Sequence, residues 1–269
     1  MGAGISNLPG IELPQLTGLA LQFLFAMLRI GAFVLSAPLF SAKFISLPLR
    51  ILFTVALSVS LMGQIALPDA SRLASLSSMA WVVQELLIGL AAGIVLQILF
   101  AAAIMAGDRI ANTAGLGLAA QVDPATGTQS PVIGQFIWLF LLVIFVTRDG
   151  HLAAIRLVLE SYRQIPPATP LHMTPLLQTG LDSVGMVYRD ATQLMMPVVS
   201  VLLILNIVIG VITRSAPQLN IFAFGFPLTM TATLLLLFLT VSLLGSALSD
   251  KVAQALGVLS FLFDEARNG

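Results

Sequence analysis

The chain has 269 residues, of which 58% are hydrophobic and only 9% are charged, and its mean hydropathy is +1.02. Soluble domains carry about 25% charged residues, so this chain lacks the polar surface that contact with water requires. We therefore predict an all-α integral membrane protein. The formal net charge is zero, which argues against nucleic acid as a partner, because phosphate binding needs clustered Lys and Arg.

The cysteine and histidine content excludes most kinds of metal site. The chain has no cysteine, so it has no disulfide, thiol nucleophile, iron–sulfur cluster or thiolate zinc site. Its only histidines are His151 and His172, too few for a histidine-rich metal centre. We expect neither a metal nor another cofactor. The first apolar run is long and no Lys or Arg precedes it, so the amino terminus is expected to be part of the mature protein, not a signal peptide.

Long stretches free of charge predict membrane segments, because about 20 apolar residues are needed to cross the hydrocarbon core as a helix. We expect about six hydrophobic helices, at 14–38, 49–67, 79–107, 132–147, 190–213 and 227–249. Six spans would put both termini on one side of the membrane, and the distribution of Lys and Arg favours the cytoplasmic side.

The polar residues gather in a loop expected at 148–189. Within it, HLAAIRLVLESY has apolar residues at helical spacing and predicts an amphipathic or interfacial helix. IPPATP would end that helix, because proline cannot continue it. The tail DKVAQALGVLSFLFDEARNG is also amphipathic and suits docking on a membrane surface or on a partner.

Two charged residues lie inside apolar segments. A charge at mid-bilayer costs about 2.5–3.5 kcal/mol on insertion scales, so each needs a partner or a wet interior. Arg29 lies deep in the first segment, and we expect it to have a partner. Glu85 lies near the start of the third segment. It either belongs to a buried ion pair or polar lining, or extends to the membrane interface.

Other residues predict how the helices pack and where they break. Gly89 and Gly93 lie four apart on one helix face, a spacing that lets another helix approach closely. Pro197 should kink the fifth helix, and Asn206 should form an interhelical hydrogen bond. The helices are thus expected to be kinked and broken.

The stretch TRSAPQLNIFAFGFP interrupts what would otherwise be one continuous apolar run. Non-helical backbone at membrane depth is tolerated only inside protein or along a watery cavity. The stretch is therefore either a loop at the membrane face or a specifically packed segment, and its amide, proline and aromatic side chains favour packing.

Motifs of enzymes are absent: there is no GxSxG, HExxH, Walker loop or glycine-rich dinucleotide fingerprint. The DGH sequence at 149–151 places one histidine beside an aspartate, a combination that is typically structural. We identify no catalytic residue and predict that the chain is not an enzyme.

Five stretches carry a family resemblance that covers nearly the whole chain: PLFSAKFISLPLR, ELLIGLAAG, AGDRIANTAGLGLAAQVDPATG, RDGHLAAIRLVLESYRQIP and NIVIGVITRSAPQLNIFAFGFPL. In this order they resemble the blocks of the FliR/SctT family of type III secretion export-gate subunits, flagellar and virulence-associated. RSAPQLNIFAFGFP is the most specific block.

The resemblance implies a structural subunit of the flagellar type III export gate, part of the channel through which unfolded flagellar proteins pass. It implies a location in the bacterial inner (cytoplasmic) membrane, in the flagellar basal body. The implied partners are FliP and FliQ homologues in a hetero-oligomeric core, FlhB and FlhA homologues, exported unfolded proteins and membrane lipids. It also implies a FliP-like part at 1–189 and a FliQ-like helical hairpin with a short tail at 190–269, and it allows an amino terminus outside the cytoplasm.

Two groups of residues follow as expected sites. Packing against partner subunits is expected at Arg29, Glu85, Gly89, Gly93, Arg214, Pro217, Gln218, Asn220 and Phe222. Residues 110–128, a run of small and apolar residues followed by a proline–glycine loop, are predicted to form a plug in the channel. Gly115 and Gly117 would let the plug bend. Leu116, Leu118 and Val122 would form a dry seal. Asp123 and Pro124 would turn the chain back toward the next helix.

Other functions remain open at this point. The virulence (injectisome) counterpart is the nearest alternative to the flagellar one. A small-solute secondary transporter would also suit broken helices and an intramembrane arginine, although no inverted halves are visible. An intramembrane enzyme is disfavoured because no nucleophile–base pair is present.

Overall fold

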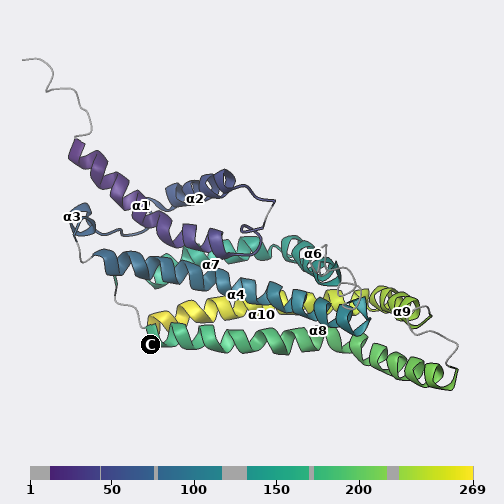
Figure 1. The fold of residues 1–269 in the computed structure, drawn as a ribbon. Helices are drawn as coiled ribbons and strands as arrows, with labels where there is room; N and C mark the ends of the chain where they lie inside the picture. Colours follow the sequence, from purple (N-terminus) through teal and green to yellow (C-terminus); the bar gives the residue numbers. More distant parts are fainter. Residues whose placement is uncertain are drawn as a thin grey trace, which may run out of the picture. The chain divides into compact units, whose positions relative to one another are not determined.

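The computed structural model describes residues 13–42, 44–75, 78–116, 132–169, 173–216 and 224–268 (Figure 1). Within these residues all regular secondary structure is helical, which confirms the all-α class. The helices are α1 (Leu13–Ser36), α2 (Leu47–Leu61), α3 (Ala70–Leu73), α4 (Ser78–Thr113), α6 (Val132–Thr147), α7 (Gly150–Gln164), α8 (Met173–Ser215), α9 (Phe226–Leu239) and α10 (Val241–Asn268).

The expected hydrophobic helices are present, but not all of them are membrane spans. By length and composition, α1, α4 and α8 can cross a membrane. Two bent helix pairs could each form one further span: α6 with α7, bent by 66°, and α9 with α10, bent by 62°. The described residues thus provide three to five candidate spans. The expected span at 49–67 is α2, whose 15 residues are fewer than the roughly 20 that a crossing needs.

The prediction of a polar loop at 148–189 is wrong over most of its length, because most of these residues are helical. α7 confirms the predicted amphipathic helix, but α8 already begins at Met173. The reason is a stripe of buried residues at helical spacing along α8, whose first members are polar: Thr179, Ser183, Asp190, Leu194, Val198 and Leu202. Hydropathy does not detect a buried stripe that begins with Thr, Ser and Asp.

The end of α8 confirms the predicted break in the apolar run. α8 contains Pro197, continues through it and ends at Ser215. Arg214 is exposed in the last turn, where a cation lies favourably beside the unpaired backbone carbonyls. The next described helix, α9, begins at Phe226.

The carboxy-terminal tail is the second half of α10 and not a separate element. Its buried residues recur every three or four positions: Leu244, Leu248, Val252, Ala255, Leu259, Leu262 and Ala266. The apolar side of the tail is therefore buried within this chain. The expectation that the tail docks on a membrane or on a partner stays a prediction, and only the exposed side of the helix, which includes Phe261, is available for it.

The chain divides into two compact units, and α4, α7, α8 and α10 contribute residues to both. The described residues of the first unit lie within Met1–Ile94, Ile155–Leu177 and Leu259–Gly269. In this unit α2 lies beside α1 (Figure 1).

Aromatic rings fill the junction between α1 and α2. Phe40, in the connection between the two helices, stacks on Phe53 of α2 with 5.1 Å between ring centroids. It meets Phe33 of α1 edge-on at 6.1 Å. The connection is thus packed against both helices that it joins.

The second unit takes its described residues from Val95–Ala154 and Gln178–Val258. α6 buries every fourth residue, at Ile133, Ile137, Leu141 and Phe145. Phe100 of α4 meets Trp138 and Phe145 edge-on, with 5.9 and 5.8 Å between ring centroids. These aromatic contacts bind α4 to α6.

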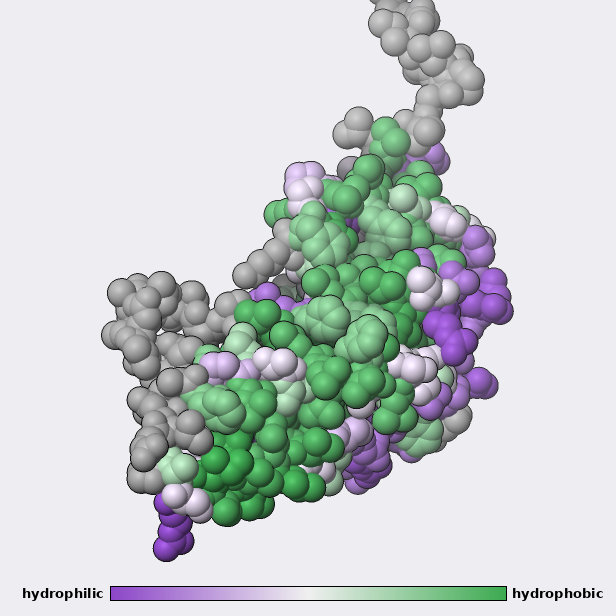
Figure 2. Space-filling model, turned by 90° about the vertical axis from the view of Figure 1, so that its right-hand side faces the viewer, coloured by the Kyte–Doolittle hydropathy of each residue, from purple (hydrophilic) through white to green (hydrophobic). Residues whose placement is uncertain are grey.

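Large apolar side chains also cover much of the outer surface (Figure 2). In the most apolar part of α4, 56% of the residues are buried within the chain, whereas in α8 only 22% are. Exposed apolar surface of this extent marks a contact with lipid or with another protein. α8 therefore needs such a cover along most of its apolar length.

α1 and α4 approach each other closely at Gly89 and Gly93. A Cβ atom on Gly89 would overlap the backbone carbonyl oxygen of Arg29, and one on Gly93 would overlap the hydroxyl of Ser36. The predicted close helix contact is confirmed, and the neighbour is α1 of the same chain. The contacts of these glycines with partner subunits stay a prediction, and an effect of bulky residues there would act first on this internal contact.

Gly89→Ala is expected to lower the free energy of unfolding by about 1–3 kcal/mol, because the added methyl group forces α1 and α4 apart. The control is Gly210→Ala in α8, where an added Cβ meets nothing within 4 Å. That change should stabilise the helix by up to about 1 kcal/mol. Thermal unfolding of the purified chain in detergent measures both effects. Equal shifts of the two melting temperatures would contradict the close contact.

Candidate functional site

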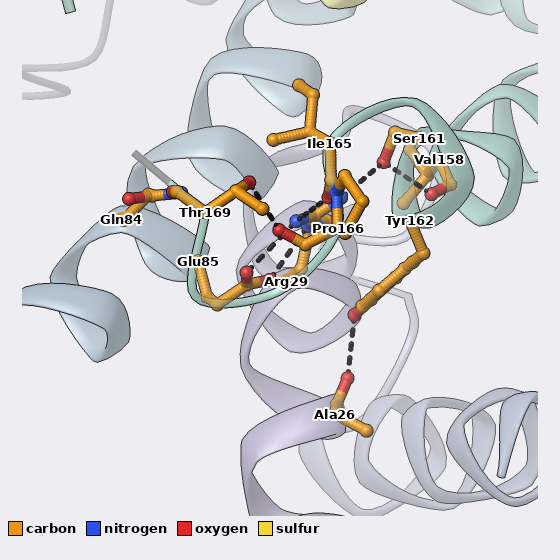
Figure 3. Close-up of polar contacts among 10 residues, drawn as sticks. All are labelled: Ala26, Arg29, Gln84, Glu85, Val158, Ser161, Tyr162, Ile165, Pro166 and Thr169. Carbon is orange, nitrogen blue, oxygen red and sulfur yellow. Dashed lines mark hydrogen bonds and ion pairs between the residues drawn. The ribbon is translucent and has the colours of Figure 1, made fainter. Parts of the chain in front are cut away.

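A fully buried ion pair joins α1 to α4 in the first unit (Figure 3). Arg29 Nε donates to Glu85 Oε2 at 2.8 Å, and Nη2 donates to Oε1 at 3.0 Å. Two parallel bonds of this kind are the strongest geometry for an arginine–carboxylate pair. Both residues are 0% exposed. The expected partner of Arg29 is thus confirmed, and Glu85 forms the buried pair and does not extend to an interface.

The other bonds of the Arg29 guanidinium go to α7. Nη1 donates to Ser161 Oγ, and Nη2 also donates to the carbonyl of Ile165, both at 3.0 Å. Ser161 Oγ in turn donates to the carbonyl of Val158 at 2.7 Å. Ile165 follows the last residue of α7, where backbone carbonyls lack helical partners. The guanidinium therefore also satisfies the end of a helix.

Tyr162 fixes α7 on α1 at a second point. Its ring centroid lies 4.2 Å from Arg29 Cζ, a cation–π contact. Its hydroxyl donates to the carbonyl of Ala26 at 2.7 Å. The chain beyond α7 is held as well, because Gln84 Nε2 donates to the carbonyl of Thr169 at 2.8 Å (Figure 3).

The spacing of three residues in α4 explains how the pair forms. Glu85, Gly89 and Gly93 are four apart, so they lie along one face of the helix. The two glycines let α1 approach, and that approach brings the short Glu85 side chain within reach of Arg29. The pair has no exposed atom that a substrate could contact. Its geometry supports a fixed junction of α1, α4 and α7.

A second feature, in the second unit, is the end of α4. The amide of Ala114 still donates to Ile110 at 2.9 Å, and that of Gly115 donates to Asn112 at 3.1 Å. Gly115 has φ +85°, a conformation that favours glycine, and the Phe226 ring lies beside it. Leu116 follows, half-buried.

α6 returns to α4 close to the point where α4 ends. A Cβ atom on Gly107 of α4 would overlap the backbone of Gly134 in α6. Sequence reasoning missed this contact. The available signal was the pair Ala103 and Gly107, which has the same small-residue spacing as Gly89 and Gly93.

Several predicted site residues lie outside the described residues and stay predictions. They are Gly117, Leu118, Val122, Asp123 and Pro124 of the expected plug, and Pro217, Gln218, Asn220 and Phe222 of the expected packing segment. Of the expected plug, the structure describes the first part, Ile110–Leu116.

Sequence reasoning also missed an ion pair between α8 and α10. Lys251 Nζ donates to Asp190 Oδ1 at 2.6 Å and to Gln254 Oε1 at 3.1 Å. The pair is slightly exposed and borders a cavity of about 20 Å³, room for about one water molecule. Asp190 begins the helix expected at 190–213 and Lys251 lies beyond the helix expected at 227–249, so no signal in the sequence indicated that the two side chains meet.

The described residues hold no group of three or more His, Cys, Asp or Glu side chains that could bind a metal ion.

Comparison with known proteins identifies the family. Residues 20–255 match the family model described as bacterial export proteins, family 1. The chain belongs to this family. Its relatives include the flagellar biosynthetic protein FliR of Escherichia coli, 31% identical over 90% of this chain and 93% of the relative. FliR of Bacillus subtilis is 29% identical over 82% and 86%. The surface presentation of antigens protein SpaR of Salmonella typhimurium is 29% identical over 74% and 75%.

Removing one member of the buried pair should cost far more than removing both. Arg29→Met alone leaves the Glu85 carboxylate buried without a partner and is expected to lower the free energy of unfolding by about 3–5 kcal/mol. Glu85→Met alone should have a similar effect. The double variant should lose much less than the sum, because no buried charge remains.

A double-mutant cycle on the chain in detergent, followed by denaturant unfolding, measures this coupling. The matched control is Arg156→Met, which removes an exposed pair with Glu160 on α7 and should change little. Additive losses for Arg29 and Glu85 would show that the two side chains do not depend on each other.

Proposed function

We propose that this chain is a structural, non-enzymatic subunit of the flagellar type III protein export gate. The observation that carries the proposal is the family match over residues 20–255, together with relatives named flagellar biosynthetic protein FliR. The match to E. coli FliR covers 90% of this chain, against 74% for the match to SpaR. The greater coverage favours the flagellar system over its virulence counterpart.

In this proposal the chain lies in the bacterial inner membrane at the flagellar basal body. Its partners are homologues of FliP and FliQ in one core complex, with FlhB and FlhA homologues beside it, and unfolded exported proteins pass through. The exposed apolar length of α8 supports an assembly of this kind, because the chain leaves it uncovered. We also propose that residues 1–189 are similar to FliP and that residues 190–269 form a hairpin similar to FliQ. This division is not that of the two compact units, each of which combines separate stretches of the chain.

Within the gate, we propose residues 110–128 as the plug. Support comes from their described start. α4 ends at Thr113, and Gly115 turns the chain out of the helix with φ +85°. The half-buried Leu116 is the first of the proposed sealing residues.

Affinity purification in mild detergent tests the assembly. We expect FliP and FliQ homologues to co-purify with this chain and to be identified by mass spectrometry, because large apolar side chains on its outer surface are left uncovered. The control is the same chain with Glu85→Met, which weakens the junction of α1, α4 and α7 and should bring down less of both partners. Recovery of the wild-type chain as a lone monomer would contradict the export reading and favour a small-solute transporter.

Photo-crosslinking tests the plug. A crosslinking residue at Leu116, Leu118 or Val122 should capture an exporting substrate. The matched control is Phe238, an exposed apolar residue of α9, which should capture lipid or a neighbouring subunit. Deletion within 116–128 should raise membrane conductance. Capture of lipid alone at Leu116, together with unchanged conductance, would exclude a sealing role.

A further inference from the structure

In the first unit, α2 buries small polar side chains. Thr54 is 5% exposed and Ser58 is 0% exposed. Each hydroxyl donates to the backbone carbonyl four residues earlier in the same helix, at 2.9 and 2.8 Å. A Cβ atom on Gly31 of α1 would lie 3.6 Å from Thr54 Cγ2, an ordinary van der Waals contact. The buried side of α2 is therefore satisfied within the chain.

Large apolar side chains cover the outer side of the same helix. Leu47, Leu49, Ile51, Leu52 and Val59 are 52–64% exposed. At about 100° per residue, these five side chains point over an arc of about 200° around the helix axis. An apolar stripe that packs on a protein core is about 100° wide. The wider arc favours lipid acyl chains, which adapt to every exposed direction, over a single neighbouring helix.

Arg50, the fourth residue of α2, holds the connection that leads from α1. Its Nε donates to the carbonyl of Ile45 at 3.2 Å, and Nη2 lies 3.0–3.1 Å from the carbonyls of Ser41, Ala42 and Ile45. The candidate membrane span in α1 ends at Ser36, just before this connection. The chain beyond the end of a span lies in the polar interfacial region of the bilayer. Arg50 is thus expected at the level of the lipid headgroups.

The charge of Arg50 has no anion opposite it in the part of the chain that the structure describes. No ion pair there includes this residue, which is half-buried, and its Nη1 has no hydrogen-bond partner there. The first turn of α2 contains no acidic residue. The amino-terminal end of a helix carries a partial positive charge, which adds to that of the guanidinium. Both charges favour an anion at this place.

We propose that α2 binds an anionic phospholipid, with the lipid phosphate at Arg50 Nη1 and the acyl chains along Leu47 and Ile51. Residues three and four apart are neighbours on a helix surface, so Leu47 lies beside both Arg50 and Ile51. The cation and the exposed apolar side chains therefore adjoin, as the headgroup and the chains of one lipid do. This inference goes beyond the proposed function and does not depend on it, since it requires only that the chain lies in a membrane.

Native mass spectrometry of the purified chain tests the contact. The chain is equilibrated in detergent with equal amounts of phosphatidylglycerol, which is anionic, and phosphatidylcholine, which has no net charge. The wild-type chain should retain mainly phosphatidylglycerol. Arg50→Gln should lower the ratio of the two retained lipids about 5-fold, the factor that corresponds to one arginine beside an anionic membrane surface.

The control is Arg72→Gln, which makes the same change at an exposed arginine of α3 in the same unit and should leave the ratio unchanged. Equal retention of the two lipids by the wild-type chain would overturn the proposal. Equal effects of Arg50→Gln and Arg72→Gln would overturn it as well.

A second pair of variants keeps Arg50, because Arg50→Gln also removes bonds to the connection. Leu47→Glu places a carboxylate three residues before Arg50, where it pairs with the guanidinium in place of the lipid phosphate. It should abolish the preference for phosphatidylglycerol without lowering the melting temperature, since an acid suits the first turn of a helix. Leu47→Gln has the same size without the charge and should keep the preference. An unchanged preference in Leu47→Glu would exclude Arg50 as the lipid contact.

Two further measurements identify the occupant. Phosphatidylglycerol should raise the melting temperature of the wild-type chain more than inorganic phosphate does; an equal rise with phosphate alone would indicate a site for a free anion and overturn the lipid. In native membranes, a photo-crosslinking residue at Leu52 should capture lipid, whereas one at the buried Leu61, on the opposite side of α2, should not. Capture of a protein chain alone at Leu52 would show that a subunit covers α2 and would overturn the proposal.

Discussion

The first unit depends on one constraint, the neutralisation of a charge that water cannot reach. Arg29 has no exposed atom, so its charge must be met by protein groups. One carboxylate, one hydroxyl and one backbone carbonyl meet it, and they come from two helices besides α1. The two bonds to Glu85 would not form if α4 lay a side chain's width further away. The ion pair and the glycines that allow the approach are therefore one feature, in which neither part functions without the other.

In the second unit two helices approach each other as closely, with few charged side chains at the contact. Its close helix contact, Gly107 on Gly134, has no ion pair beside it in the described structure and is supported by edge-on aromatic rings around Phe100. Its own ion pair, Lys251 with Asp190, retains some exposure and borders a small cavity. Its other polar contacts between elements join Asn206 to Thr113, Thr229 to Ala114 and Arg148 to Ser249, and only the last has a charged donor. In the first unit, loss of one partner would leave a buried charge, whereas a neutral bond such as that from Asn206 of α8 to the carbonyl of Thr113 contributes about 0.5–1.5 kcal/mol.

The sequence was sufficient to predict that certain single residues in apolar helices need a contact. An arginine deep in an apolar run needs a partner, an asparagine in an apolar helix needs a bond, and two glycines four apart invite a helix; each of these was found. It could not predict which residues meet, because pairing is set by the tertiary crossing of helices. Glu85 remained ambiguous for this reason. The start of α8 was missed for another reason, since Thr179, Ser183 and Asp190 are buried by packing and hydrogen bonding that hydropathy does not count.

The length of α8 bears on what surrounds it. Exposed large apolar side chains occur along it from Leu181 to Ile212. At 1.5 Å per residue these two positions are about 46 Å apart along the helix, whereas the hydrocarbon core is about 30 Å thick. Tilt alone would have to approach about 50° to fit them, beyond the 0–40° that membrane helices show. The hydrocarbon core therefore cannot cover the whole exposed apolar length of α8, and the part outside it lies in the interfacial region or against protein, as it would in a subunit of a larger membrane complex.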